Sequence, residues 1–198
     1  MSKGTETRQA VLEEAARVAS RVGLGGLTIG SLAATTRLSK SGLFAHFQSK
    51  EALQLQLLEH TRERFIDLVI RPALAAPRGE PRVRELFRRW LVWDTEALPG
   101  GCLFVAASAE LDDQPGPVRD RLARDQRDWM DTIAQVFRTG IAEGHFRPDA
   151  DPEQFAYDLH GVMLAFHHTS RLLGDPDAAA RATRAVEALL LAARRPAS

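Results

Sequence analysis

The chain has 198 residues, of which 44% are hydrophobic, and its 26 basic residues balance its 26 acidic ones. This composition excludes a disordered chain and predicts one ordinary domain or two small ones. The single cysteine excludes an intrachain disulfide, and because neither a secretory signal nor an 18-residue apolar stretch is apparent, we expect a soluble, cytoplasmic protein without a membrane segment.

The first 50 residues predict three short helices. Apolar residues recur on one face of the first helix, which glycines at 23, 25 and 26 end: Val11, Ala15, Val18 and Val22. Thr28 is a suitable N-cap for a second helix to about residue 35, and Ser39 for a third to about residue 47. The last two helices, joined by a four-residue turn, match the plan of a helix-turn-helix over 28–47.

A long helix is predicted from Ser49 through Leu68 to Pro72. Five more follow between proline and glycine breakers, over about 81–97, 102–112, 116–143, 152–173 and 176–194. Asp151-Pro152 and Asp175-Pro176 each place an N-cap acid before a first-turn proline. The sequence therefore predicts an all-α fold of about nine helices. We expect two modules, one at 1–52 with the short helices and a helical body at 53–198, joined by the long helix.

The helix pair at 28–47 carries side chains suited to DNA. Lys40, Ser41 and His46 can form hydrogen bonds with base edges or phosphates. Residues 1–50 contain seven Lys and Arg against three acids, whereas the remainder contains 19 against 23. A basic end suits a polyanion. On spacing and capping alone, a plain helical hairpin with a solvated polar face remains an equal alternative.

From Thr7 to about Leu58 the sequence resembles the N-terminal domain of the TetR family of bacterial repressors. The resemblance is carried by Gly42-Leu43-Phe44-Ala45-His46-Phe47 and by Ser49-Lys50-Glu51-Ala52-Leu53. It implies a ligand-responsive transcriptional regulator that binds a palindromic operator as a dimer and is released by a small effector. Repression is the outcome that the resemblance favours, and activation stays open.

Carried over by position, the resemblance implies a set of DNA-binding residues. Ser39, Lys40 and Ser41 form the tip of the recognition helix, Thr28 caps the preceding helix beside a phosphate, and His46 and Lys50 touch the DNA backbone. Two positions depart from the family pattern. Phe44 stands where a tyrosine hydroxyl commonly meets a phosphate, and Arg37 stands where glycine is common in the turn, with a phosphate within its reach.

For the body, the resemblance implies an effector pocket and a homodimer interface formed by the helices at 152–173 and 176–194. Eight alanines in and around the last helix favour close helix packing. Large side chains suggest an apolar or aromatic effector, with His167 as a polar anchor: Trp90, Trp93, Phe104, Trp129, Phe137, Met163 and Phe166, besides Met130 and Tyr157. The alternative for each of them is a place in the hydrophobic core.

Other chemistry is not indicated. His160, His167 and His168 share a helix, but no acid or cysteine completes a metal site. Cys102 is expected to be a buried thiol, with redox sensing as the alternative, and Glu110, Asp112 and Asp113 are expected to form a solvated helix end. No phosphate loop, nucleophile elbow or metalloprotease helix is present. We therefore expect no enzyme, catalytic residue or cofactor; a small helical enzyme and an interaction bundle are the competing hypotheses.

Overall fold

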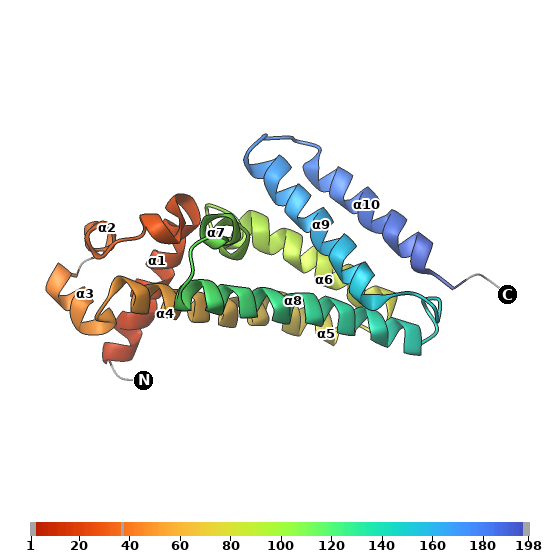
Figure 1. Cartoon of the computed structure of the whole chain (residues 1–198), viewed down its shortest axis with the longest axis horizontal. Coiled ribbons are helices and arrows are strands. Elements are labelled where there is room, and N and C mark those ends of the chain that lie inside the picture. Colours follow the sequence, from red (N-terminus) through yellow and green to blue (C-terminus); the bar gives the residue numbers. More distant parts are fainter. Residues whose placement is uncertain (1–2, 37, 196–198) are drawn as a thin grey trace. The chain divides into compact units, whose positions relative to one another are not determined.

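The computed structural model describes residues 3–36 and 38–195. In these ranges the chain is helical, apart from an isolated antiparallel bridge between Phe146 and Arg194, which confirms the expected all-α class (Figure 1). The helices are α1 (Lys3–Gly26), α2 (Ile29–Thr35), α3 (Lys40–Phe47), α4 (Lys50–Phe65), α5 (Arg71–Ala75), α6 (Glu80–Val92), α7 (Leu103–Leu111), α8 (Pro117–Ala142), α9 (Pro152–Arg171) and α10 (Ala178–Ala193). Two π-helical turns, η1 (Ile66–Ile70) and η2 (Trp93–Ala97), continue α4 and α6. No helix in the described ranges has the length and apolar character needed to cross a bilayer.

The predicted caps of the short helices are present. Thr28 is extended and accepts a hydrogen bond from the Ser31 backbone N–H, while the Ser31 hydroxyl accepts one from the Thr28 N–H, so the two form a capping box. Ser39 caps α3 by accepting from the Gly42 N–H. The apolar side chains Leu43 and Phe47 of α3 are completely buried, as expected.

The connecting helix differs from the prediction. It does not end at Pro72, because the π-helical turn η1 intervenes and Pro72 lies in the first turn of α5, where no N–H is required. Within η1, Leu68 is exposed and the next residue, Val69, is buried. The helix thus continues to Ala75.

The start of the last helix also differs. It was predicted at 176 with Asp175 as its cap, but α10 begins at Ala178. The Asp175 carboxylate instead accepts from the Asp177 N–H and from Arg181, so the Asp-Pro pair forms a turn before the helix. At α9 the same pattern behaves as predicted, because Asp151 accepts from the N–H groups of Glu153 and Gln154.

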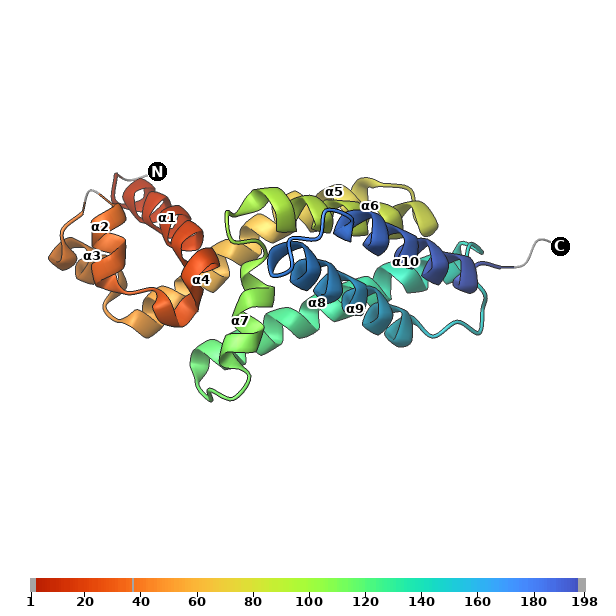
Figure 2. The ribbon, with the colours of Figure 1, turned by 90° about the horizontal axis from the view of Figure 1, so that it is seen from above.

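The chain divides into two compact units. One comprises residues 1–65 and 95–125, and the other comprises 66–94 and 126–198. The first therefore contains α1 to α4, α7 and the start of α8. In the second, α9 and α10 run side by side in both views, as Figure 2 shows from above, and Phe137 stacks between Phe146 and Phe155 with ring centroids 4.3 and 4.0 Å away. The chain crosses between the units at 65/66, beside η1, at 94/95, within η2, and at 125/126, within α8.

Candidate nucleic-acid interface

The start of α2 and the start of α3 lie close together. Thr28 and Lys40 are exposed, and both approach Gly30: a Cβ added there would lie 3.6 Å from Thr28 Oγ1 and 4.0 Å from Lys40 Nζ. The N-terminal N–H groups of α2 carry partial positive charge, and the Lys40 ammonium adds a full one. This pairing has the chemistry of a phosphate-binding point.

The exposed tip of α3 is short and polar. Ser39 and Ser41 place their hydroxyl oxygens 3.0 Å apart, and both side chains are exposed together with Lys40. Small hydroxyl side chains at a helix start allow the backbone to come close to base edges in the major groove. The structure therefore groups three of the sequence-predicted residues on one accessible surface.

The remaining predicted residues of this module have mixed surroundings. Phe44 is 52% exposed, while His46 is half-buried with its ring 6.1 Å from that of Phe47. Lys50 is exposed, but its Nζ donates to the Gly25 carbonyl oxygen at 2.5 Å. Arg37 lies outside the described residues. Their contacts with DNA remain predictions.

The corner between α3 and α4 was not anticipated from the sequence. Gln48 has φ 63° and ψ −44°, and the Ser49 N–H donates to the Phe47 carbonyl across it at 2.6 Å, which forms a γ-turn. A positive φ is costly for a side chain with a Cβ. The turn fixes the direction in which α4 leaves α3. In the sequence, its signal was the short gap between the two predicted helices.

The end of α1 is held by side chains from two other helices. After non-helical Gly23, the Glu110 carboxylate of α7 accepts from the Leu24 N–H at 2.7 Å and from the Gly25 N–H. From α4, Lys50 donates to the Gly25 carbonyl and Gln54 to the Leu24 carbonyl. The expectation that Glu110 belongs to a solvated helix end is therefore wrong, because its carboxylate satisfies two backbone donors.

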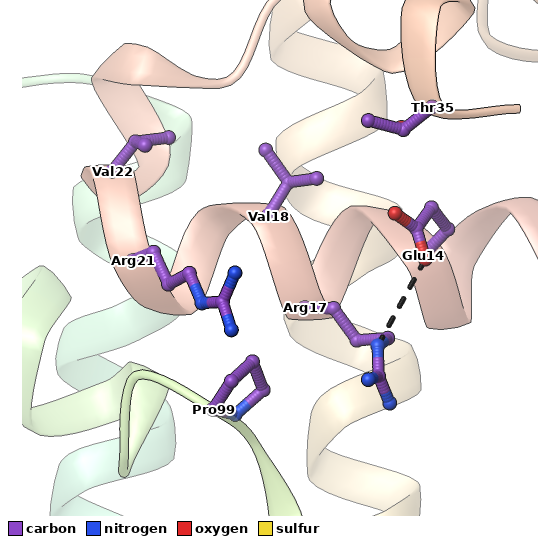
Figure 3. A pocket seen from close by; sticks show the side chains of 7 residues that line it. All are labelled: Glu14, Arg17, Val18, Arg21, Val22, Thr35 and Pro99. Carbon is purple, nitrogen blue, oxygen red and sulfur yellow. Dashed lines mark ion pairs between the residues drawn. The ribbon is translucent and has the colours of Figure 1, made fainter.

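A groove of about 500 Å³ runs along α1 (Figure 3). Val18, Val22 and Pro99 give it apolar walls, and Arg17 and Arg21 line it as well. Arg17 lies 3.9 Å from Glu14, whereas Arg21 forms no ion pair with any residue of the described ranges. The groove thus brings two of the basic residues counted in 1–50 together with one acid, Glu14.

In the body, the predicted effector residues occupy several places. Trp90 of α6 meets Phe166 of α9 edge to face at 6.1 Å, and Trp93, Trp129 and Met163 are also buried in this second unit. Phe104 packs edge to face on Phe65 in the first unit, and Phe137 belongs to the phenylalanine stack. Tyr157, named among the large side chains around a pocket, is 70% exposed.

His167 has a partner that sequence reasoning missed. Its Nδ1 lies 2.6 Å from Oδ1 of Asp94, a completely buried carboxylate in η2, while the histidine side chain keeps 14% exposure. A carboxylate on one ring nitrogen fixes the orientation of the other. Asp94 therefore turns His167 into an oriented polar group.

Other reactive side chains are isolated. Burial lowers the pKa of His160, and His168 is exposed. Cys102 is buried at the start of α7. Across the described residues, no three histidines, cysteines or acids gather into a group that could hold a metal ion.

The fold and the polar, basic helix pair define a helical DNA-binding protein. Residues 11–57 match the family described as "Bacterial regulatory proteins, tetR family", and residues 79–186 match "Tetracyclin repressor-like, C-terminal domain". The HTH-type transcriptional repressor DhaR of Mycobacterium sp. (strain GP1) is 28% identical over 156 residues, which cover 77% of this chain and 76% of that protein.

Solved structures are similar over nearly the whole chain. A TetR-family transcriptional regulator from Cytophaga hutchinsonii has a TM-score of 0.86 and 21% identity, covering 100% of this chain and 99% of its own. AibR, solved in complex with isovaleryl coenzyme A and operator DNA, has a TM-score of 0.72 and 22% identity, covering 96% and 99%. Both show the same fold.

The chain belongs to the TetR family. It is a ligand-responsive transcriptional repressor that binds DNA.

Proposed function

We propose that the protein binds a palindromic operator as a homodimer, in the cytoplasm where the DNA is, and that an apolar or aromatic effector releases it. The exposed tip of α3 is the observation that carries the DNA-binding part. The major groove is contacted by Ser39, Lys40 and Ser41. One phosphate is bound by Thr28 and Lys40. Further contacts with the DNA backbone come from Phe44, His46, Lys50 and Arg37. A two-fold dimer places two such helices about one DNA turn apart, on the order of 35 Å.

The dimer proposal rests on an apolar face of α9 and α10. Tyr157 and Leu164 of α9 are 70% and 40% exposed, and Leu191 of α10 is 67% exposed. Gly161 lies between the two α9 residues, and a Cβ there would meet nothing within 4 Å. Large apolar side chains beside a glycine allow two helices to pack closely, so this face suits a second copy of the chain.

The effector proposal rests on the aromatic and polar groups of the second unit. Trp90 and Phe166 supply apolar contact surface, and His167, oriented by Asp94, supplies one polar group. Trp93, Trp129, Phe137 and Met163 of this unit are the further candidate lining residues. Such a combination is typical of sites for small apolar ligands. AibR, which binds isovaleryl coenzyme A, shows that this fold can hold an acyl ligand.

The DNA-binding part is tested by selecting duplexes from a random library with the wild-type protein and footprinting the enriched sequence. Two protected half-sites about 10 base pairs apart are expected. Lys40→Ala should weaken binding, while Arg195→Ala removes the same charge from the end of α10 and should not. Equal effects of both variants, or no protection at low salt, would contradict the assignment.

The dimer face is tested by sedimentation velocity. Leu164→Glu and Leu191→Glu should convert dimers to monomers, because a buried carboxylate in the interface has no partner. Leu74→Glu, at a similarly exposed leucine of α5, is the matched control and should leave the dimer intact. A monomeric wild type, or dimers that survive both substitutions, would refute this interface.

The effector part is tested by thermal shift with a panel of short-chain apolar and single-ring aromatic compounds. A compound that binds the folded state raises the melting temperature. The same compound should release the protein from the selected duplex, and Trp90→Ala should abolish both effects. Binding that survives Trp90→Ala unchanged would place the effector elsewhere.

A further inference from the structure

The last turn of α1 links segments that are far apart in the sequence. The helical hydrogen-bond ladder is interrupted at Gly23, whose φ of 77° lies outside the helical region. The following N–H groups therefore need another acceptor, and the two oxygens of Glu110 supply it. Bonds from backbone N–H groups to a carboxylate are stronger than those between neutral groups, so they help to fix α1 against α7.

The contact leaves little freedom at either partner. A Cβ at Gly25 would lie 2.4 Å from Glu110 Oε1, and one at Gly23 would lie 2.6 Å from Oε2. Only residues without a side chain allow the carboxylate to reach the backbone this closely. The glycines at 23 and 25 therefore provide the space that the Glu110 carboxylate needs to reach the backbone of the turn.

A second contact joins the same two segments. The Gly100 N–H donates to the Ser20 hydroxyl at 3.0 Å, and a Cβ on Gly100 would fall 1.7 Å from the Ser20 carbonyl oxygen. The loop before α7 thus packs backbone to backbone on α1. Both contacts lie inside the first compact unit, although α1 belongs largely to the N-terminal family match and α7 to the C-terminal one.

We propose that Glu110 is a positioning residue for operator binding, which couples the helix-turn-helix to α7. Residues 95–125 are joined to the second unit at η2 and within α8, so they are a covalent route, besides the junction of α4 and η1, by which a change there reaches the first unit. Without the carboxylate, the two bonds at the end of α1 are lost while the Gly100–Ser20 contact remains, so α1 and the helices packed on it are held less firmly against α7. The two heads of a dimer then lose their fixed spacing, and this inference rests on the dimer proposed above.

The coupling predicts a difference between two kinds of DNA binding. Operator binding requires both heads in one arrangement, whereas weak binding to random DNA depends on the charges of each head alone. Glu110→Ala should weaken binding to the selected duplex about ten-fold, the ratio that corresponds to about 1.4 kcal/mol. Its binding to a random duplex of equal length at low salt should stay within two-fold of wild type.

The test measures both affinities for Glu110→Ala, Gly25→Ala and their double variant. Gly25→Ala disturbs the contact from the other side, so the double variant should be no weaker than the worse single one. Asp113→Ala removes the same charge from an exposed position three residues away and is the control. If Glu110→Ala does not fold, the affinities for the selected and the random duplex are measured with Gly25→Ala and Glu110→Gln instead.

Three results would overturn the proposal. These are an unchanged operator affinity in Glu110→Ala, an equal loss on both duplexes, or the same loss in Asp113→Ala. In each case the wild-type protein would still bind the selected duplex as a dimer. A failure of the coupling is therefore distinct from a failure of the proposed function.

Discussion

Lys50 Nζ donates a hydrogen bond to the carbonyl oxygen of Gly25, 25 residues earlier in the chain, at 2.5 Å. The side chain that the family pattern assigns to the DNA backbone is therefore also a structural contact between α4 and the end of α1. Lys40, equally exposed at the start of α3, makes no side-chain hydrogen bond or ion pair within the described residues. The two lysines of the module should consequently respond differently to substitution.

Lys40→Ala should reduce operator affinity and lower the salt dependence by about one counterion, without changing the melting temperature. Lys50→Ala should lower the melting temperature as well, because the Gly25 carbonyl loses its donor. Binding titrations at several salt concentrations, together with thermal unfolding, separate the two effects. A Lys50→Ala protein of wild-type stability would show that the internal bond contributes nothing.

Phe44→Tyr should strengthen DNA binding. The ring is 52% exposed, so a hydroxyl can be added without burial, and in the family this position commonly meets a phosphate. One hydrogen bond of about 1 kcal/mol corresponds to roughly a five-fold gain in affinity. Phe44→Leu, which adds no donor, should show no gain. If the tyrosine variant binds no better than wild type, Phe44 does not face a phosphate.

Gln48→Gly should stabilise the protein, since glycine adopts the positive φ of the γ-turn without steric cost. The expected gain is about 1 kcal/mol, and Gln48→Ala, which keeps the Cβ, should give none. Chemical denaturation measures both. A loss of stability in the glycine variant would mean that the added freedom of the unfolded chain outweighs the relieved strain.

The free energy of unfolding should decrease as the pH falls below about 6.5, the ordinary pKa of histidine. His60 is a buried residue of α4 that faces Gln9 of α1, and its pKa is lowered by this burial and by Arg64. The unfolded chain takes up the proton at the ordinary pKa, so protons favour unfolding from there down to the lowered folded value. The melting temperature should therefore fall between pH 7.5 and 5.5.

His60→Asn provides the control for this pH effect. Asparagine can keep a polar atom near Gln9, which lies 3.3 Å from His60 Nδ1, but it does not titrate. The variant should show a smaller decrease in melting temperature over the same pH range. An unchanged pH dependence would assign the effect to other groups, such as His160.

The parts of the fold that depend on neighbouring residues were readable from the sequence. Thr28, Ser39 and Asp151 each act on an N–H two or three residues away, so their type and position predict the cap. The helix periodicity likewise predicted the burial of Leu43 and Phe47. The same local pattern gave a wrong prediction at Asp175. Its carboxylate accepts hydrogen bonds from the Asp177 N–H and from Arg181, and α10 begins only at Ala178.

The contacts that position the module were not readable, because their partners lie far apart in the chain. Glu110 and Gly25 are separated by 85 residues, and Asp94 and His167 by 73. In one dimension Glu110 is one of several acids before a proline, and Asp94 is one acid in a helical stretch. Only the tertiary fold reveals which of these carboxylates is committed to a backbone or histidine partner.

The mass of the complex formed with the selected duplex tests the central claim most directly. We expect two chains per duplex for the wild type and a single chain or none for Leu164→Glu. The double variant Lys40→Ala with Ser41→Ala should form no complex. One wild-type chain per duplex, or a complex that survives removal of the α3 tip, would contradict a dimeric repressor that reads DNA with α3.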